Sequence, residues 1–477
     1  MRGGKDNDSV TRAAIIIGAG MGGLTAALRL SQGGFRVRVI EARAEPGGLA
    51  SGCVFDGFSF DAGPYILLDR PGLEWAFSSL GLSLSSAVEL HAIDHVYSVD
   101  SAEHPAINIY ASDAKTAAEL GRAWPGSEEK YLRFVERTRA VEASLRPLLY
   151  RTAPGPLSLL GGGRWHHLSF LLKSLQAIFR ESELPPAVVD ALSIWTHVAG
   201  QRPDQAPSPL AFVPALIHSV GCFYPKEGIR AIPVLLAKAA AEAGVDFHYS
   251  TKAQRILSSG GRVTGVETDQ GELLPANVVI SDCGIATYLR LLEQDAPRSR
   301  KSCERLLLQS PGVCAYLAIK GEMRPPYLRF LLPGGSERCR LLIRPASLDQ
   351  REVSDEWSAA RLLGPMDHEK AQKMGPEGQR HYMEKLLTEK WWQQGISEFR
   401  VLSKRTPAEW GSEYSLARDS MNPVMTAKFM REGRLAHRSP DLRGLYLAGS
   451  ATHPGQWVSF CAISGVLAAD CVRQDLS

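Results

Sequence analysis

The alternation of apolar and polar residues near the amino terminus predicts a strand, a helix and a second strand. Residues 13–17 form an apolar, largely β-branched run that is short enough for a buried parallel strand. Residues 24–31 then follow helical spacing, and Gly33-Gly34 predicts the end of that helix. Residues 37–40 return to a strand pattern. The chain is therefore expected to begin with a β-α-β unit.

The turn after the first strand carries three glycines with the spacing G-x-G-x-x-G, at Gly18, Gly20 and Gly23. In a dinucleotide site the first allows a tight turn, the second lets the backbone approach a pyrophosphate, and the third lets the helix pack on the sheet. Glu41 follows the second strand, where a carboxylate accepts hydrogen bonds from ribose hydroxyls. We therefore predict a dinucleotide site; a glycine-rich turn in an ordinary α/β unit is the alternative.

The α/β pattern stops after residue 70 and returns near residue 224. A strand is expected over residues 55–60, before the change. From about residue 71 to residue 224 apolar residues recur at helical spacing, as in 131–145 and 168–178. We therefore expect an inserted, mostly helical region that builds a substrate compartment.

Residues 164–180 combine aromatic, basic and apolar side chains. Residues 164–167 read Arg-Trp-His-His, and the amphipathic helix expected after them carries Lys173 and Arg180 on its polar face. Such a flank is compatible with a helix that lies in a membrane interface, although the pattern alone favours the alternative given next. A core helix with a solvated face is the alternative.

Two later stretches repeat the α/β pattern. Residues 232–240 predict a helix, and strand-like runs over 245–281 predict a strand, a β-meander and another strand. Residues 444–448 predict a strand, followed by a turn of small residues and a helix over 458–470. A helix that begins after such a turn directs backbone N–H groups at an anion. This second element predicts FAD rather than a nicotinamide dinucleotide.

Composition narrows the function classes. The length of 477 residues predicts two or three domains, and the net charge of +3 gives no argument for nucleic acid. The eight cysteines form no C-x-x-C pair, so neither a metal site nor a disulfide framework is expected, and a reducing cytoplasm fits. No apolar run reaches the length of a membrane span, and residues 1–12 read as a polar tail without a signal peptide.

Several stretches together resemble the bacterial-type phytoene desaturase family of flavoproteins, within the amine-oxidase-like group of FAD enzymes. The matching stretches run from one end of the chain to the other: 15–41, 46–50, 61–64, 224–228, 278–282 and 444–465. The most specific of them is Gly449 followed by Thr452-His453-Pro454-Gly455. Members of this family desaturate, isomerise or saturate long apolar polyenes, and many work at a membrane surface.

The resemblance implies an α/β fold in two parts. A Rossmann-like FAD-binding domain of the glutathione-reductase type would comprise residues 1–75, 225–300 and 440–477. An inserted α+β substrate domain, helical in its first part, would comprise residues 76–224 and 301–439. The expected activity is desaturation of an apolar polyene, isoprenoid or lipid-like substrate by hydride transfer to flavin N5. An amine oxidase and a redox-neutral isomerase or saturase of the same fold remain alternatives.

The resemblance also implies the residues that hold FAD, which come from several parts of the chain. They are Gly18, Gly20, Gly22, Gly23, Glu41, Ala42, Arg43, Gly48, Leu49, Gly63, Pro64, Ala253, Gly449, Ser450, Gln456, Trp457 and Val458.

Three departures from the family pattern affect the site. Leu49 stands where the family usually has arginine, so an expected phosphate contact is missing, and Glu227 replaces a glycine. After Gly455 the family continues with small residues, whereas this chain places Trp457 and Phe460 there. We therefore expect a retained cofactor site and a reshaped pocket with walls from Trp457, Phe460 and Tyr224, for a substrate that is shorter than a C40 polyene or enters differently.

Two residues are candidates for acid–base catalysis. His453 would move a proton or shape the flavin edge; a turn histidine bonded only to backbone is the alternative. Glu227 would have a raised pKa if it lay beside an apolar pocket, and an exposed loop acid is its alternative.

Overall fold

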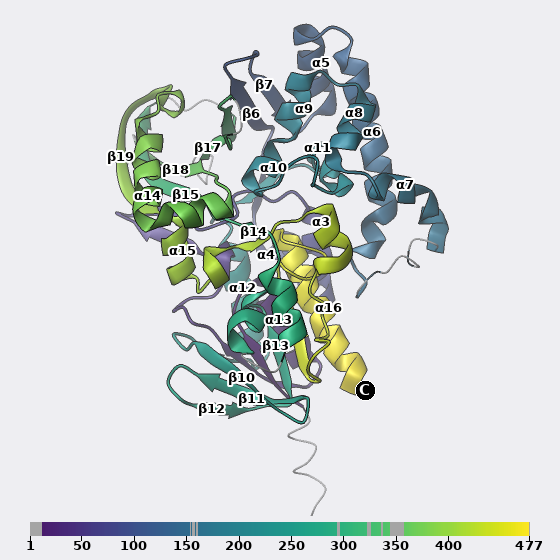
Figure 1. Ribbon diagram of the computed structural model, residues 1–477, viewed down its shortest axis with the longest axis vertical. Coiled ribbons are helices and arrows are strands. Elements are labelled where there is room, and N and C mark those ends of the chain that lie inside the picture. Colours follow the sequence, from purple (N-terminus) through teal and green to yellow (C-terminus); the bar gives the residue numbers. More distant parts are fainter. Residues whose placement is uncertain are drawn as a thin grey trace, which may run out of the picture.

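The computed structural model describes residues 12–476 except 153, 155–157, 159–160, 293–295, 322–325, 335–336 and 344–356. Residues 1–11 of the tail expected over 1–12 lie outside the described residues. In the described part of the chain, a five-stranded and a seven-stranded sheet are the largest, and a three-stranded sheet, three two-stranded sheets and helices accompany them (Figure 1). In the described part, no helix is both long and apolar enough to cross a lipid bilayer.

A five-stranded parallel sheet assembles from the beginning, middle and end of the chain. Its strands lie in the order β21 (Leu445–Leu447), β13 (Val278–Ser281), β1 (Ala13–Ile17), β2 (Arg36–Ile40) and β9 (Asp246–His248). Ile15 and Ile16 of β1 lie between Val279 and Ile280 of β13 on one side and β2 on the other. Strands β1, β13 and β21 are almost wholly buried, which explains their continuous apolar runs.

Three helices pack beside this sheet: α2 (Met21–Gln32), α12 (Ala231–Glu242) and α16 (Val458–Leu476). The Thr25 hydroxyl in α2 donates to the Ala462 carbonyl in α16 over 3.0 Å, and Arg29 forms an ion pair with Asp470 at 2.9 Å. These contacts fix the carboxyl-terminal helix against α2, the helix that follows the amino-terminal glycine loop.

The expected meander is present as three antiparallel strands, β10 (Ala253–Ser259), β11 (Arg262–Thr268) and β12 (Leu273–Pro275). It lies below the parallel sheet in Figure 1. The preceding strand-like run, at 245–249, joins the parallel sheet as β9.

A seven-stranded sheet forms the second part of the molecule, in the order β19-β15-β18-β17-β16-β6-β7. Its strands are β19 (Ile396–Arg405), β15 (Val313–Gly321), β18 (Trp357–Gly364), β17 (Arg340–Ile343), β16 (Leu328–Leu332), β6 (His95–Ser101) and β7 (Ile107–Tyr110). The last two lie in the stretch expected to be mostly helical. Apart from the short strands β5 (Leu90–Ala92) and β8 (Phe223–Pro225), its other described elements are helices, which include α6 (Ser127–Leu145) and α11 (Phe212–Ser219).

Two sequence predictions of single elements are wrong. The helix expected over 168–178 is broken into α7 (Leu168–Leu171) and α8 (Leu175–Ser182), because Ser174 caps α8 through Ala177 N–H at 3.3 Å. The strand expected over 55–60 is a hairpin of β3 (Gly52–Phe55) and β4 (Phe58–Asp61), since Asp56 and Gly57 turn the chain with positive φ.

Candidate dinucleotide and substrate site

One large cavity of about 1250 Å³ runs from the glycine loop of the parallel sheet into the helical part of the molecule. Most of the residues expected to bind the cofactor line it. They are Gly18, Gly20, Gly22, Glu41, Ala42, Arg43, Gly48, Leu49, Gly63, Pro64, Ala253, Ser450, Gln456, Trp457 and Val458. Gly23 and Gly449 lie directly behind this wall, in contact with the lining residues.

The glycine loop has the geometry that a bound diphosphate requires. Gly18 has a φ of +96°, which makes the turn from β1 into α2. A Cβ atom on Gly22 would lie 2.7 Å from the backbone nitrogen of Gly449. Only glycine therefore lets the amino-terminal loop and the turn after β21 approach each other, and this approach brings two segments of distant sequence to one site.

Glu41 lies at the carboxyl end of β2 and is buried. Its carboxylate accepts hydrogen bonds from Ala19 N–H at 2.6 Å and from Arg43 N–H at 2.9 Å. Burial raises its pKa, while these backbone donors and the Arg43 guanidinium lower it. The two bonds orient the carboxylate and leave lone pairs for ribose hydroxyls.

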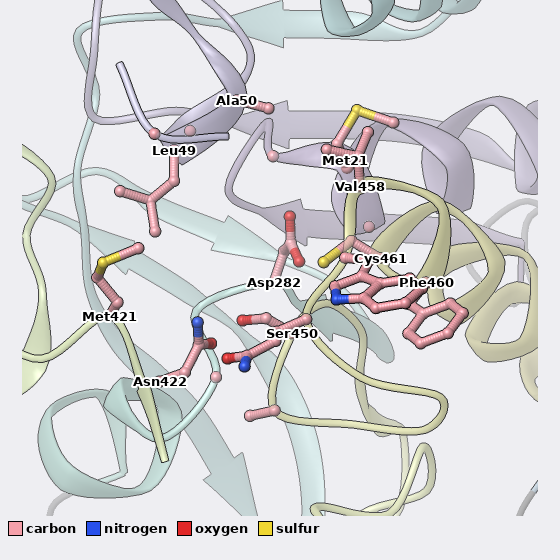
Figure 2. Close-up of a pocket in the computed structure, with 18 of the residues that line it drawn as sticks. Met21, Leu49, Ala50, Asp282, Met421, Asn422, Ser450, Val458, Phe460 and Cys461 are labelled. Atoms are coloured by element: carbon pink, nitrogen blue, oxygen red, sulfur yellow. The ribbon is translucent and has the colours of Figure 1, made fainter. Parts of the chain in front are cut away.

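Asp282 is a residue of this site that the sequence predictions omitted, although 278–282 matched the family. It follows β13 and projects into the cavity between Leu49 and Met421 on one side and Val458 on the other (Figure 2). Its carboxylate accepts a hydrogen bond from Gly23 N–H at 2.9 Å. Burial and the charge of Glu41 raise its pKa to about 7. Its place after a parallel strand, at the edge where ligands bind, was the available signal.

The residues at the start of α16 offer polar groups to a cofactor. Val458 is the first residue of the helix, and its first-turn N–H groups have no partner within the helix. Gln456 places a buried side-chain oxygen without a hydrogen-bond partner in the cavity wall. Gly449 N–H, by contrast, is already bonded to the Ser464 hydroxyl at 3.0 Å. The close glycine loop, the oriented Glu41 and the unpaired Gln456 oxygen fit a flavin dinucleotide.

The far part of the cavity is apolar. Trp457 and Phe460 are stacked with ring centroids 4.8 Å apart, and both line the cavity as expected. Figure 2 shows Phe460 beside Val458 and Cys461. Leucine side chains from α6 and α7 and the ring of Phe212 continue the wall. This part can hold a hydrocarbon chain away from water.

His453 lines the cavity, but both of its ring nitrogens are engaged. Nε2 faces the carbonyl oxygens of Leu148 and Leu149 at 3.0 and 3.2 Å, and Nδ1 faces Arg434 Nη1 at 3.1 Å. Burial and the Arg434 charge lower its pKa to about 3. The histidine is therefore neutral, with Nε2–H donating and Nδ1 accepting. This geometry favours the backbone-bonded alternative over an acid–base role.

Two other expected site residues lie outside the cavity wall. Glu227 is exposed in the turn after β8 (Phe223–Pro225), as in the exposed-loop alternative, and does not line the cavity. Tyr224 is buried in β8, where its hydroxyl donates to Asp61 and its ring packs on Tyr327. The family motif at 224–228 therefore places neither side chain in the cavity wall. Strand β8 pairs with β5 (Leu90–Ala92).

A buried ion-pair cluster in the cavity wall was also missed. Arg146, after α6, pairs with Asp69 at 2.7 Å and with Glu142 at 2.7 Å. Asp69 also accepts a hydrogen bond from Ser459 in the first turn of α16 at 2.9 Å. These bonds join the helical part to the helix that begins at the cofactor end. Their sequence separation, up to 390 residues, left no local signal.

Comparisons with known proteins agree with this geometry. Residues 16–77 match the family described as NAD(P)-binding Rossmann-like domain. The chain is 27% identical to the zeta-carotene-forming phytoene desaturase of Myxococcus xanthus, across 96% of this chain and 93% of that protein. It is 24% identical to the 4,4'-diapolycopene oxygenase of Methylomonas sp, across 98% of this chain and all of that protein.

Solved structures show the same fold. An oxidoreductase from Methanosarcina mazei superposes with a TM-score of 0.69 at 17% identity, covering 95% of this chain and 98% of that one. Putrescine oxidase superposes with a TM-score of 0.65 at 15% identity, covering 97% and 99%. These structures and the Rossmann-like family match confirm the α/β class with a Rossmann-like unit. The sequence relatives confirm the resemblance to the phytoene desaturases and the assignment as an oxidoreductase.

Proposed function

We propose that this relative of the phytoene desaturases binds FAD and desaturates a carbon–carbon bond of an apolar polyene or isoprenoid chain. The observation that carries the proposal is the single cavity that joins the glycine loop to the apolar chamber. A ligand held by Glu41 and the loop would extend along the start of α16 toward Trp457 and Phe460. Bound there, FAD would supply the hydride acceptor, at flavin N5.

The chain's own residues would position the substrate and exclude water. Trp457 and Phe460 would form one wall for the hydrocarbon, and the leucines of α6 and α7 another. The Arg146–Asp69–Ser459 bonds would hold the helical part against α16 and so keep the two walls of the chamber together. Neutral His453 would fix the adjoining backbone through Leu148 and Leu149 rather than exchange protons.

The test uses the purified protein reconstituted with FAD. One FAD per chain should be released on denaturation, and anaerobic addition of phytoene or a shorter isoprenoid should bleach the flavin while a new double bond appears in the product. A protein that takes up no FAD would contradict the proposal. Bleaching by a primary amine but by no isoprenoid would replace it with an amine oxidase.

We further propose that residues 164–180 contact a membrane from which the substrate enters. Trp165, Leu168 and Leu172 expose 66%, 45% and 60% of their surface. Leu171, between the last two, lines the cavity. The exposed apolar surface therefore lies on the outer side of the chamber wall, at the outer edge of the helices in Figure 1. Such a patch is typical of a protein or membrane contact.

A further inference from the structure

Arg434 is a charged side chain of the cavity wall that lacks an acidic partner. It follows the short helical turn η9 (Phe429–Gly433) and lines the cavity near His453. Its Nη1 faces the neutral His453 ring, and its Nη2 faces the sulfur of Met430, which is a weak acceptor. Its Nε–H is buried without any partner. No carboxylate in the described part of the chain stabilises its charge.

The other arginines of the same wall differ from Arg434. Arg146 pairs with Asp69 at 2.7 Å, and Arg43 lies 3.7 Å from the carboxylate of Glu413. Arg290 donates to the Ser415 carbonyl at 2.6 Å. A buried cation without a counter-ion is costly, so its retention at a ligand cavity indicates a ligand that supplies the counter-ion.

Arg434 remains a cation at neutral pH. Burial lowers its pKa to about 10, which still leaves the guanidinium protonated at pH 7. His453 accepts one of its hydrogen bonds and cannot neutralise it. The flexible side chains of Met425 and Met430 complete the surroundings, and both also line the cavity. Of its five N–H groups, one faces His453 and one faces the Met430 sulfur. The second N–H of each terminal nitrogen is left to face a planar anion in the cavity.

We propose that Arg434 binds a carboxylate at one end of the substrate, so that the chain acts on an isoprenoid or polyene acid rather than on a pure hydrocarbon. This inference rests on the proposed function, since it names the substrate class of the same cavity. The guanidinium would form two parallel N–H···O bonds to the carboxylate, and the hydrocarbon tail would lie along Trp457 and Phe460 toward the cofactor end.

Other polar groups of the cavity suit a substrate that ends in a hydroxyl, so the test must compare an acid with an alcohol. The side-chain oxygens of Gln201, Gln309 and Asn422 are buried in the wall without partners. Oxygens of this kind accept from a hydroxyl and offer nothing to a carboxylate. An alcohol would be selected if they, rather than Arg434, held the end of the substrate.

The experiment titrates the FAD-loaded protein anaerobically at pH 8 with geranylgeranoic acid, geranylgeraniol and the matching C20 hydrocarbon, following the visible flavin spectrum. The wild type should bind the acid at least about tenfold more tightly than either neutral probe. Arg434→Met should abolish that preference, and Arg434→Lys should keep part of it, because lysine keeps the charge but not the fork. Arg431→Met, an exposed arginine on η9, should leave it unchanged.

Three outcomes would overturn the inference. They are equal binding of the acid and the hydrocarbon by the wild type, tighter binding of the alcohol, and an acid preference that survives in Arg434→Met. Loss of FAD from Arg434→Met and Arg434→Lys would instead make the cofactor diphosphate the missing counter-ion, which also overturns it. In each case wild type that still holds FAD and is bleached by a hydrocarbon leaves the proposed function standing.

Discussion

At the scale of single residues, the ionisation of Asp282 is expected to control cofactor affinity. Its carboxyl lies beside the glycine loop and titrates with a pKa of about 7. The neutral form is compatible with a nearby diphosphate, whereas the carboxylate repels it. FAD affinity should therefore fall as the pH rises from 6 to 8, by up to about tenfold, because only the protonated fraction binds well.

Replacement of this residue isolates the effect. Asp282→Asn should bind FAD with the same dissociation constant at pH 6 and pH 8, measured by fluorescence titration of the apoprotein. Asp269→Asn, an exposed turn residue of the meander, should keep the wild-type pH dependence. A wild-type affinity that is flat over this range would show that the Asp282 carboxyl does not face the diphosphate.

His453 gives the second residue-scale prediction. Its pKa of about 3 keeps it neutral from pH 5 to pH 9, so it contributes no ionisation to a rate profile in that range. His453→Ala should leave the shape of the pH–rate profile unchanged. It should lower the free energy of unfolding by about 1–3 kcal/mol, because Arg434 and two backbone carbonyls lose their partner.

Urea denaturation and turnover from pH 5 to pH 9 measure both effects. His381→Ala, an exposed histidine on α14 (His368–Thr388), is the matched control for stability. The disappearance of one limb of the pH–rate profile in His453→Ala would restore the acid–base role that the sequence suggested.

At the scale of elements, the sequence predicted what local pattern decides. The β-α-β unit over residues 13–40 follows from buried runs, helical spacing and glycines, all of which act between near neighbours. The break at Ser174 and the hairpin turn at Asp56-Gly57 were missed because apolar periodicity continues across both. The strand β6 was missed because it pairs in parallel with β16, more than 200 residues away. The strand β7 was missed with it, because its partner in the sheet is β6.

The residues of the candidate site also fall into those that a local motif predicts and those that it does not. Glu41 and the glycine loop were predictable, since each belongs to one short motif. Arg434 and the Arg146–Asp69 pair were not, because their significance lies in which partner is present or missing in space.

The exposed apolar side chains of residues 164–180 give the prediction at the scale of elements. Replacing Trp165, Leu168 and Leu172 by serine should reduce co-flotation with vesicles of phosphatidylcholine and phosphatidylglycerol several-fold, because each apolar side chain buried in lipid contributes roughly 1.5–3 kcal/mol. The matched control replaces three exposed apolar residues elsewhere, Val234, Leu273 and Leu307. Equal flotation of the two variants would assign residues 164–180 to an ordinary solvated helix surface.

At the scale of the whole molecule, the site exists only where the two ends of the chain meet. Gly22 and Gly449 are 427 positions apart, yet a Cβ on Gly22 would lie 2.7 Å from the Gly449 nitrogen and 2.9 Å from its Cα. Gly22→Ala should therefore push the turn after β21 away from the glycine loop. We expect FAD affinity to fall at least about tenfold and stability to fall by about 1–3 kcal/mol, the usual effect of overpacking.

Fluorescence titration with FAD and thermal denaturation of the apoprotein measure the two effects of Gly22→Ala separately. Gly121→Ala in helix α5 (Asp113–Ala123) is the control, because its new methyl group would lie 3.1 Å from the Glu128 side chain of α6, and neither residue lines the cavity. If Gly22→Ala bound FAD as tightly as the wild type, the two chain ends would not need to approach so closely. The cofactor would then be held by the amino-terminal unit alone, and the contact between α2 and α16 would serve stability rather than binding.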